Sequence, residues 1–195
     1  MRVSEMNKLT AHYDRYFMQK DAVVLHPTEG KYHIDALLYK PTERYPFWKL
    51  ASMGASDYKM NGNNSLGNRN EYMMFIDSSV NMEDKDTASW YYQKLLQVAL
   101  YPVLENEFIS YGHSIELEKS DDSDIVCAYL EMPQAIYDTG ILRCKTAWTK
   151  KAICLQIILL NQGEMEHLLE IGGEEFSYTY TYPEGDAEGH YLCKK

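Results

Sequence analysis

Residues 154–160 constrain the fold more than any other stretch, because they are apolar on both faces of an extended chain apart from Gln156. Such a strand is stable only where other elements cover the sheet on both sides. The run is too short to cross a bilayer. We therefore expect residues 146–160 to be extended and broken near Lys150 and Lys151 into two strands or a hairpin, with the later part in the middle of a sheet.

A second pair of extended segments lies at 33–39 and 47–53. The first is rich in β-branched, leucine and aromatic residues, and the second stops at Gly54. The connection between them carries Pro41 and Pro46, which exclude a helix there and suit a turn. This pattern predicts a β-hairpin with a long loop.

Three segments show the spacing of amphipathic helices, with apolar residues recurring at steps of three and four. We expect helices from Ser4 to near Gln19 or Lys20, from a cap at Asp86 to near Tyr101, and from Asn161, with Glu164 completing a capping box, to Gly172 and Gly173. In the second helix, Trp90 and Tyr91 fall in step with the aliphatic residues. They are therefore expected in the core rather than in an exposed docking patch.

Further strands are expected at 22–25, 71–76, 114–117 and 125–132. Residues 176–182 alternate aromatic and hydroxyl side chains, which predicts a strand with a buried aromatic face. Helices and strands mix irregularly along the chain. We therefore predict an α+β fold with a mixed, mostly antiparallel sheet flanked by about three helices. A length of 195 residues suits a single domain over 1–195.

The hairpin and the strand after it resemble the suppressor-of-fused domain family. The similarity is densest over 33–77, and it is carried by His33-Ile34-Asp35, Pro46-Phe47-Trp48, Gly54-x-Ser56-Asp57, Met60 and Asn70-Glu71-Tyr72. A later segment, 159–166, is similar to the family's late strand and the acidic helix after it. The sequence departs from the family at Lys49, Ala51 and Ala55.

The resemblance implies a suppressor-of-fused-like fold and a role in binding rather than catalysis. The animal member of the family restrains a transcription factor, and many bacterial members look like immunity proteins encoded beside secreted toxins. We therefore expect a polypeptide partner that is neutralised or restrained, with a basic toxin domain as one candidate. The resemblance also points to partner-binding residues, which are Trp48, Ser56, Asp57 and Arg69. Their alternative role is to hold the hairpin and its following loop in shape.

The net charge of the chain indicates which class of partner to expect. With 29 acidic and 19 basic residues the formal charge is −10, which argues against a general DNA or RNA binder. A negative surface would steer a basic partner, although it also serves simply to keep a protein in solution. The candidate acidic surface comprises Glu116, Glu118, Asp121, Asp122, Glu164 and Glu166.

The sequence shows no signal-peptide pattern and no membrane span, so we expect a cytoplasmic protein that does not bind membranes. The four cysteines lack Cys-x-x-Cys spacing, so neither a zinc site nor a redox motif is indicated, and free buried thiols are expected. The histidines also lack metal-ligand spacing, so no metal ion or other cofactor is predicted. The oligomeric state is not indicated.

An enzymatic alternative rests on His33 and Asp35. These residues are two apart on an expected strand, so they share one face and could act as a base with its orienting carboxylate. They could equally bond to structural neighbours, because no nucleophile is indicated nearby. The alternative function is therefore a small, hydrolase-like enzyme with its site around His33 and Asp35.

Overall fold

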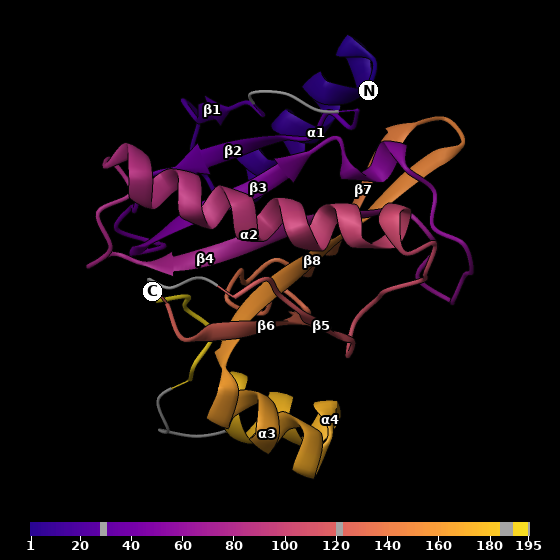
Figure 1. Cartoon of the computed structure of the whole chain (residues 1–195). Coiled ribbons are helices and arrows are strands. Elements are labelled where there is room, and N and C mark those ends of the chain that lie inside the picture. Colours follow the sequence, from indigo (N-terminus) through magenta and orange to yellow (C-terminus); the bar gives the residue numbers. More distant parts are fainter. Residues whose placement is uncertain (28–30, 120–122, 184–188, 195) are drawn as a thin grey trace.

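The computed structural model describes residues 1–27, 31–119, 123–183 and 189–194. Its centre is an eight-stranded sheet in the order β1-β2-β3-β4-β8-β6-β5, with β7 pairing only with β8 (Figure 1). The pair β4–β8 is parallel and the others are antiparallel, which confirms the mixed, mostly antiparallel α+β fold. The strands are β1 (Val23–Leu25), β2 (Asp35–Tyr39), β3 (Phe47–Met53), β4 (Asn70–Asp77), β5 (Ser114–Glu116), β6 (Ile125–Glu131), β7 (Arg143–Ala147) and β8 (Lys150–Asn161).

Strand β8 lies in the middle of the sheet, as its two apolar faces predict. It pairs with β4 on one side and with β6 and β7 on the other. Ile153, Leu155 and Ile157 belong to the core cluster on one face, while Ala152 and Cys154 belong to the cluster on the other. Both faces are therefore buried, and β7 and β8 form the expected hairpin.

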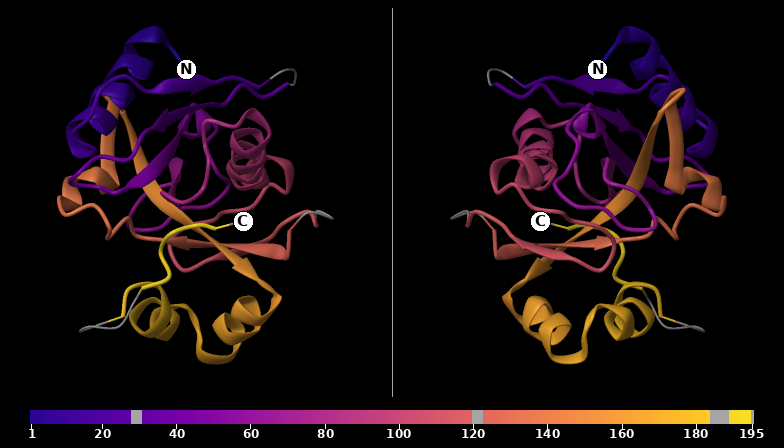
Figure 2. Two further views of the ribbon diagram at one scale, coloured as in Figure 1. Left: turned by 90° about the vertical axis from the view of Figure 1, so that its left-hand side faces the viewer. Right: turned by 90° about the vertical axis from the view of Figure 1, so that its right-hand side faces the viewer.

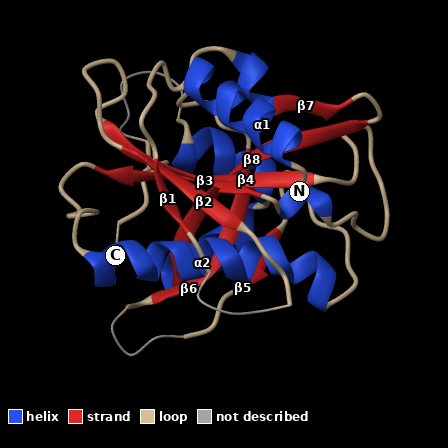
Figure 3. Ribbon diagram, turned by 90° about the horizontal axis from the view of Figure 1, so that it is seen from above, coloured by secondary structure: helices blue, strands red, loops and turns tan. Residues whose placement is uncertain are grey.

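Helices cover both faces of the sheet. Figure 3 shows α1 (Val3–Tyr16) and α2 (Lys85–Leu104) on opposite sides. Figure 2 shows α3 (Gln162–Ile171) and α4 (Gly173–Phe176) at the far end of the sheet from α1. Trp90 and Tyr91 of α2 lie in the core, as expected. The four cysteines are free and buried, also as expected.

The prediction of a strand at 176–182 is wrong. These residues continue from α4 into a π-helical turn, Ser177–Thr181. Phe176 and Tyr180 are four apart, so a helical backbone stacks their rings, with centroids 4.7 Å apart. The Thr179 hydroxyl donates to the Glu175 carbonyl at 2.7 Å, and His190 stacks on Tyr180. An alternating aromatic pattern also contains pairs at helical spacing, and packing against the rest of the chain decides between the two.

The first helix is shifted from its expected bounds. It begins at Val3 rather than after Ser4, and the capping interaction is a hydrogen bond from the main-chain N–H of Arg2 to the Glu5 carboxylate at 3.0 Å. It ends at Tyr16, several residues before the expected end. The chain turns at Met18, whose φ of 52° is incompatible with a right-handed helix.

The second helix begins one residue before the expected cap. Asp84, not Asp86, is the N-cap, and its carboxylate accepts hydrogen bonds from the main chain and the hydroxyl of Thr87. The helix also continues through Pro102 to Leu104. A proline disfavours the helical conformation of the residue before it but does not exclude it, and Pro102 lies inside this helix. The third helix has the expected capping box of Asn161 and Glu164.

A buried carboxylate connects β3, the turn after it and β4. Glu71 of β4 is fully buried, and its oxygens accept from the Ser52 hydroxyl at 2.6 Å and from main-chain N–H groups of Gly54, Ala55 and Ser56. Burial raises the pKa of Glu71, although the bonds from Ser52 and Ser56 partly counter it. The Ser52 hydroxyl also accepts from the main-chain N–H of Tyr72.

We predict that Glu71→Gln lowers the free energy of unfolding by about 2–4 kcal/mol, because the amide replaces one acceptor with a donor that faces buried N–H and O–H groups. Urea unfolding measures the change. The matched control is Glu83→Gln, an exposed carboxylate whose substitution should leave stability nearly unchanged. If Glu71→Gln lowered the free energy of unfolding no more than Glu83→Gln does, the hydrogen bonds of Glu71 would not stabilise the fold.

Candidate functional site

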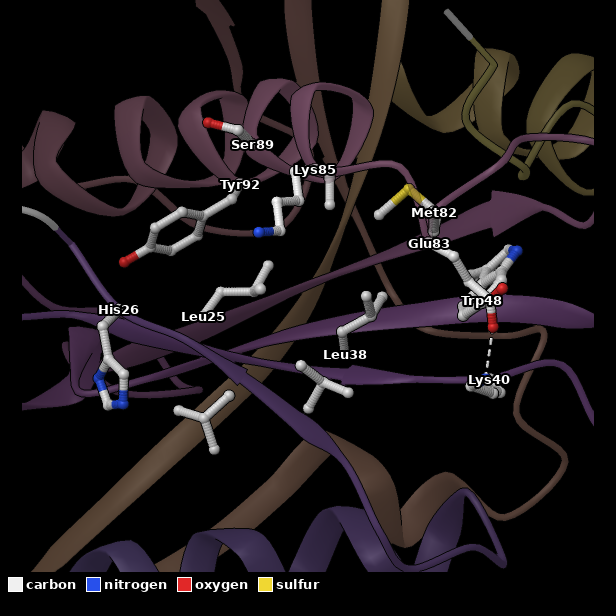
Figure 4. Close-up of a pocket in the computed structure, with 13 residues that line it drawn as sticks. Leu25, His26, Leu38, Lys40, Trp48, Met82, Glu83, Lys85, Ser89 and Tyr92 are labelled. Atoms are coloured by element: carbon white, nitrogen blue, oxygen red, sulfur yellow. Dashed lines mark hydrogen bonds and ion pairs between the residues drawn. The ribbon is translucent and has the colours of Figure 1, made fainter.

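A groove of about 630 Å³ lies between the edge strand β1 and helix α2 (Figure 4). Its walls are mainly apolar, and Figure 4 shows Lys85 and Ser89 on the side of α2, between two polar ends. Lys40 and Glu83 form an ion pair at one end, 2.5 Å apart, and His26 lies at the other. The remaining lining residues are Val23, Val24, Leu25, Leu38, Trp48, Met82, Lys85, Ala88, Ser89 and Tyr92.

The local sequence explains the apolar floor of the groove. Side chains alternate between the faces of a strand, so Leu38 of β2 and Trp48 of β3 point toward α2 together with other members of the same core cluster. Tyr92 of α2 donates from its hydroxyl to the Ile34 carbonyl at 2.6 Å, which ties the helix to the start of β2. The groove therefore lies where α2 leaves the edge of the sheet uncovered.

Strand β1 forms one wall of the groove and is at the end of the sheet order, paired only with β2. Val23 and Val24 are 52% and 41% exposed. The outer edge of β1 therefore presents main-chain N–H and C=O groups and apolar side chains that no other strand covers in the described part of the chain. Exposed edges of this kind are templates for a further strand.

His26, His33 and Asp35 meet at the His26 end of the groove. Leu25 pairs with Ala36, so the antiparallel register places the next residue, His26, opposite Asp35. His26 Nδ1 and His33 Nε2 lie 2.8 and 3.1 Å from the same Asp35 oxygen, Oδ1. The imidazoles are exposed, whereas the carboxylate is 3% exposed. The spacing of His33 and Asp35 predicts their contact, but His26 is missed because only the β1–β2 register reveals it.

The cluster lacks the arrangement of a nucleophilic hydrolase. In the residues that the structure describes, neither imidazole is hydrogen-bonded to a hydroxyl or thiol group. A Ser, Thr or Cys nucleophile is normally activated by such a bond to its base. The Tyr58 hydroxyl is close, but it accepts the main-chain N–H of His33 rather than contacting the ring.

The four residues expected to bind a partner do not form one surface. Trp48 lies near the start of β3 and Ser56 beyond its end, so the seven-residue strand separates them by about 20 Å. Arg69 donates to the Ser56 and Asp57 carbonyls at 2.7 and 2.9 Å, and Lys150 pairs with the Asp57 carboxylate. These contacts hold the turn in shape, and Trp48 alone of the four lines the groove.

The acidic residues are also divided. Glu116 and Glu118 are exposed at β5, the opposite edge of the sheet from β1. Glu164 and Glu166 belong to α3, where Glu164 completes the capping box and accepts from the Tyr180 hydroxyl. Asp121 and Asp122 lie outside the described residues. In the described ranges, no helix is long and apolar enough to cross a membrane.

Comparisons with known proteins give a consistent result. A sequence model described as suppressor of fused protein matches residues 30–181. A suppressor of fused homologue from Neisseria gonorrhoeae has a similar structure, with a TM-score of 0.70, 12% identity, and coverage of 98% of this chain and 94% of that one. No curated protein sequence matches significantly.

Two further solved structures are similar. The Sufu–Fu complex gives a TM-score of 0.62 and 14% identity over 87% of this chain and 81% of that one. Drosophila Suppressor of Fused gives 0.61 and 15% identity over 88% of this chain, but the match spans only 45% of the Drosophila chain. At these identities the similarity to solved structures establishes the fold alone.

We predict that Asp57 acts through its ion pair with Lys150. Burial alone would raise the pKa of Asp57, but the hydrogen bonds and positive charges of Lys150 and of the Met1 amino group together outweigh burial and hold the pKa below its usual value. Asp57→Asn should therefore cost about 1 kcal/mol at pH 7. The stability that the carboxylate contributes is present above its unfolded pKa and is lost as the pH falls through the lower folded pKa. Urea unfolding from pH 7 to pH 3 should show the difference shrinking.

A double-mutant cycle provides the control for this prediction. Asp57→Asn, Lys150→Met and the double variant should show a coupling energy of at least about 0.5 kcal/mol at pH 7. Additive effects would mean that the pair makes no net contribution.

Proposed function

This chain belongs to the suppressor of fused family, and we propose that it is a non-enzymatic protein-binding domain that holds an extended polypeptide segment in the groove between β1 and α2. The observation that carries the proposal is the unpaired edge of β1, with two exposed valines, beside an apolar groove. One of the similar solved structures is a complex of Sufu with Fu, which supports a polypeptide as the ligand.

The geometry favours an extended segment over a helix. A chain lying along β1 would gain main-chain hydrogen bonds from the free edge, and its alternate side chains would enter the groove. Apolar side chains would contact Leu38 and Trp48, and the Lys40–Glu83 pair would meet a polar group at one end. A helical ligand would leave the edge groups of β1 unpaired.

The proposed role is to neutralise or restrain the bound polypeptide in the cytoplasm, as an immunity protein does with a toxin. A basic toxin domain is the proposed partner, because a protein with a formal charge of −10 attracts a basic chain. The exposed acids at β5 lie at the opposite edge of the sheet from the groove, so they would not contact the bound segment. They would act only by attracting the basic partner as it approaches. We propose no enzymatic activity around His33 and Asp35, because in the part of the chain that the structure describes neither imidazole of that cluster is hydrogen-bonded to a hydroxyl or thiol group.

We predict that Val23→Asp weakens partner binding at least tenfold. A carboxylate on β1 would be desolvated by an added strand and would also remove apolar contact area from the groove. The partner is first isolated from lysate of the source cells with the tagged wild-type protein, and the purified polypeptide is then titrated by calorimetry.

The matched control for this prediction is Val3→Asp. Val3 is also an exposed valine, 72% exposed, but it lies on α1 away from the groove. Binding by this variant should equal that of the wild type. Equal affinity of the Val23→Asp protein would place the interface elsewhere, and a Val3→Asp defect would indicate a general effect of added charge.

We also predict that partner association depends on salt through Glu116 and Glu118. Association should slow as ionic strength rises from about 0.05 to 0.5 M, because the Debye length falls from above 10 Å to below 5 Å. Reversing both charges to Lys should slow association at low salt and flatten this dependence, whereas reversing the exposed Glu43 should not. Stopped-flow kinetics measures the rates, and a salt-independent rate for the wild type would refute the basic partner.

A further inference from the structure

We infer that His26, His33 and Asp35 form a binding site for a divalent transition-metal ion, with Zn²⁺ as the expected ion. The inference does not depend on a polypeptide binding in the groove. The three side chains offer two imidazole nitrogens and one carboxylate oxygen. Zn²⁺ prefers this ligand set, whereas Mg²⁺ and Ca²⁺ prefer oxygen ligands alone.

The distances suit one ion held by all three groups. Their ligand atoms lie within 4.8 Å of one another. Bonds of about 2.1 Å in a tetrahedral site place neighbouring ligand atoms about 3.4 Å apart. The two nitrogens lie 2.8 and 3.1 Å from Asp35 Oδ1, so binding requires these two nitrogen–oxygen pairs to separate by about 0.6 and 0.3 Å. Both imidazoles are exposed enough to turn, which makes this adjustment possible.

Burial of the Asp35 carboxylate also favours a bound cation. The Asp35 side chain is 3% exposed, and in the described part of the chain its Oδ1 is hydrogen-bonded to His26 Nδ1 and lies 3.1 Å from His33 Nε2. A carboxylate removed from water is unfavourable unless charge or several hydrogen bonds compensate it. A divalent ion between the carboxylate and the imidazoles supplies that compensation.

The main chain that carries two of the ligands is fixed from several sides. The Tyr58 hydroxyl accepts from the His33 N–H at 3.1 Å, and the Tyr92 hydroxyl donates to the Ile34 carbonyl at 2.6 Å. Gly54, with φ of 126°, lies so close that a Cβ there would approach the His33 carbonyl oxygen to 3.0 Å. This support makes Asp35 a fixed ligand, around which the exposed rings of His26 and His33 can close.

Three protein ligands leave at least one coordination position for water or another donor. Because both imidazoles are exposed, that position is accessible from solvent. The site therefore has the character of an open metal site rather than a closed structural one.

The test is a titration of the purified, chelator-treated full chain with Zn²⁺ by calorimetry, and with Co²⁺ by visible absorption. We expect one tight site per chain, with Co²⁺ absorption bands of a four- or five-coordinate nitrogen and oxygen site. His26→Ala and His33→Ala should each weaken Zn²⁺ binding at least tenfold, and the double variant should lose the site. Both imidazoles are exposed, so these variants should keep the circular dichroism spectrum of the wild type.

His113→Ala is the matched control, since His113 is an exposed histidine outside the cluster. It should bind Zn²⁺ as the wild type does. The inference is overturned if the wild-type chain shows no one-to-one site, or if the double variant binds as tightly as the wild type. Either result would leave the proposed polypeptide binding untouched, because Val23 is no ligand and the two assays share no readout.

Discussion

The buried carboxylate of Glu71 fixes the geometry on which the rest of the molecule depends. It binds the hydroxyl at the end of β3 and the main chain of the turn after it, so the backbone of Gly54 is held in a conformation that few other residues adopt. That glycine lies against the His33 carbonyl. The same turn presents the Ser56 carbonyl to Arg69. One buried carboxyl group thus fixes both the main chain at the start of β2 and the turn between β3 and β4.

This constraint separates the residues of β3 that hold the turn in shape from the residue that lines the groove. The end of the strand is occupied by internal partners, because Ser56, Asp57 and Arg69 satisfy one another or Glu71. The start of the strand contributes Trp48 to the groove, where α2 leaves the edge of the sheet open. Polar groups that already have hydrogen-bond partners gain little from a ligand. An unpaired strand edge beside apolar side chains can gain both main-chain hydrogen bonds and buried apolar area.

The sequence was sufficient for the features that depend on local pattern. The two apolar faces of β8, the prolines between β2 and β3, and the capping box at Asn161 each leave one reasonable structure. The failures arise where local patterns are ambiguous. In 176–182 the spacing of the aromatic residues fits both a strand and a helix. In the helical form Phe176 contacts Tyr129, which is distant in sequence.

The site was harder to predict for a related reason. Trp48 and Arg69 lie in one dense motif, but a strand of about 20 Å places its two ends in different surroundings. His26 is separated from Asp35 by nine residues, and only the register of β1 against β2 makes them neighbours.

In the proposed function, the two edges of the sheet affect different steps of binding, namely the arrival of the partner and the lifetime of the complex. Charges are largely screened beyond a Debye length of about 8 Å at physiological ionic strength, and β5 is at the opposite edge of the sheet from β1, so the acids near β5 would attract the proposed basic chain mainly at low ionic strength and would not touch it when bound. The proposed contacts at β1 are short-ranged and would govern how long the partner stays bound. A partner could therefore change its charge and keep its bound lifetime, or change its strand and keep its rate of arrival.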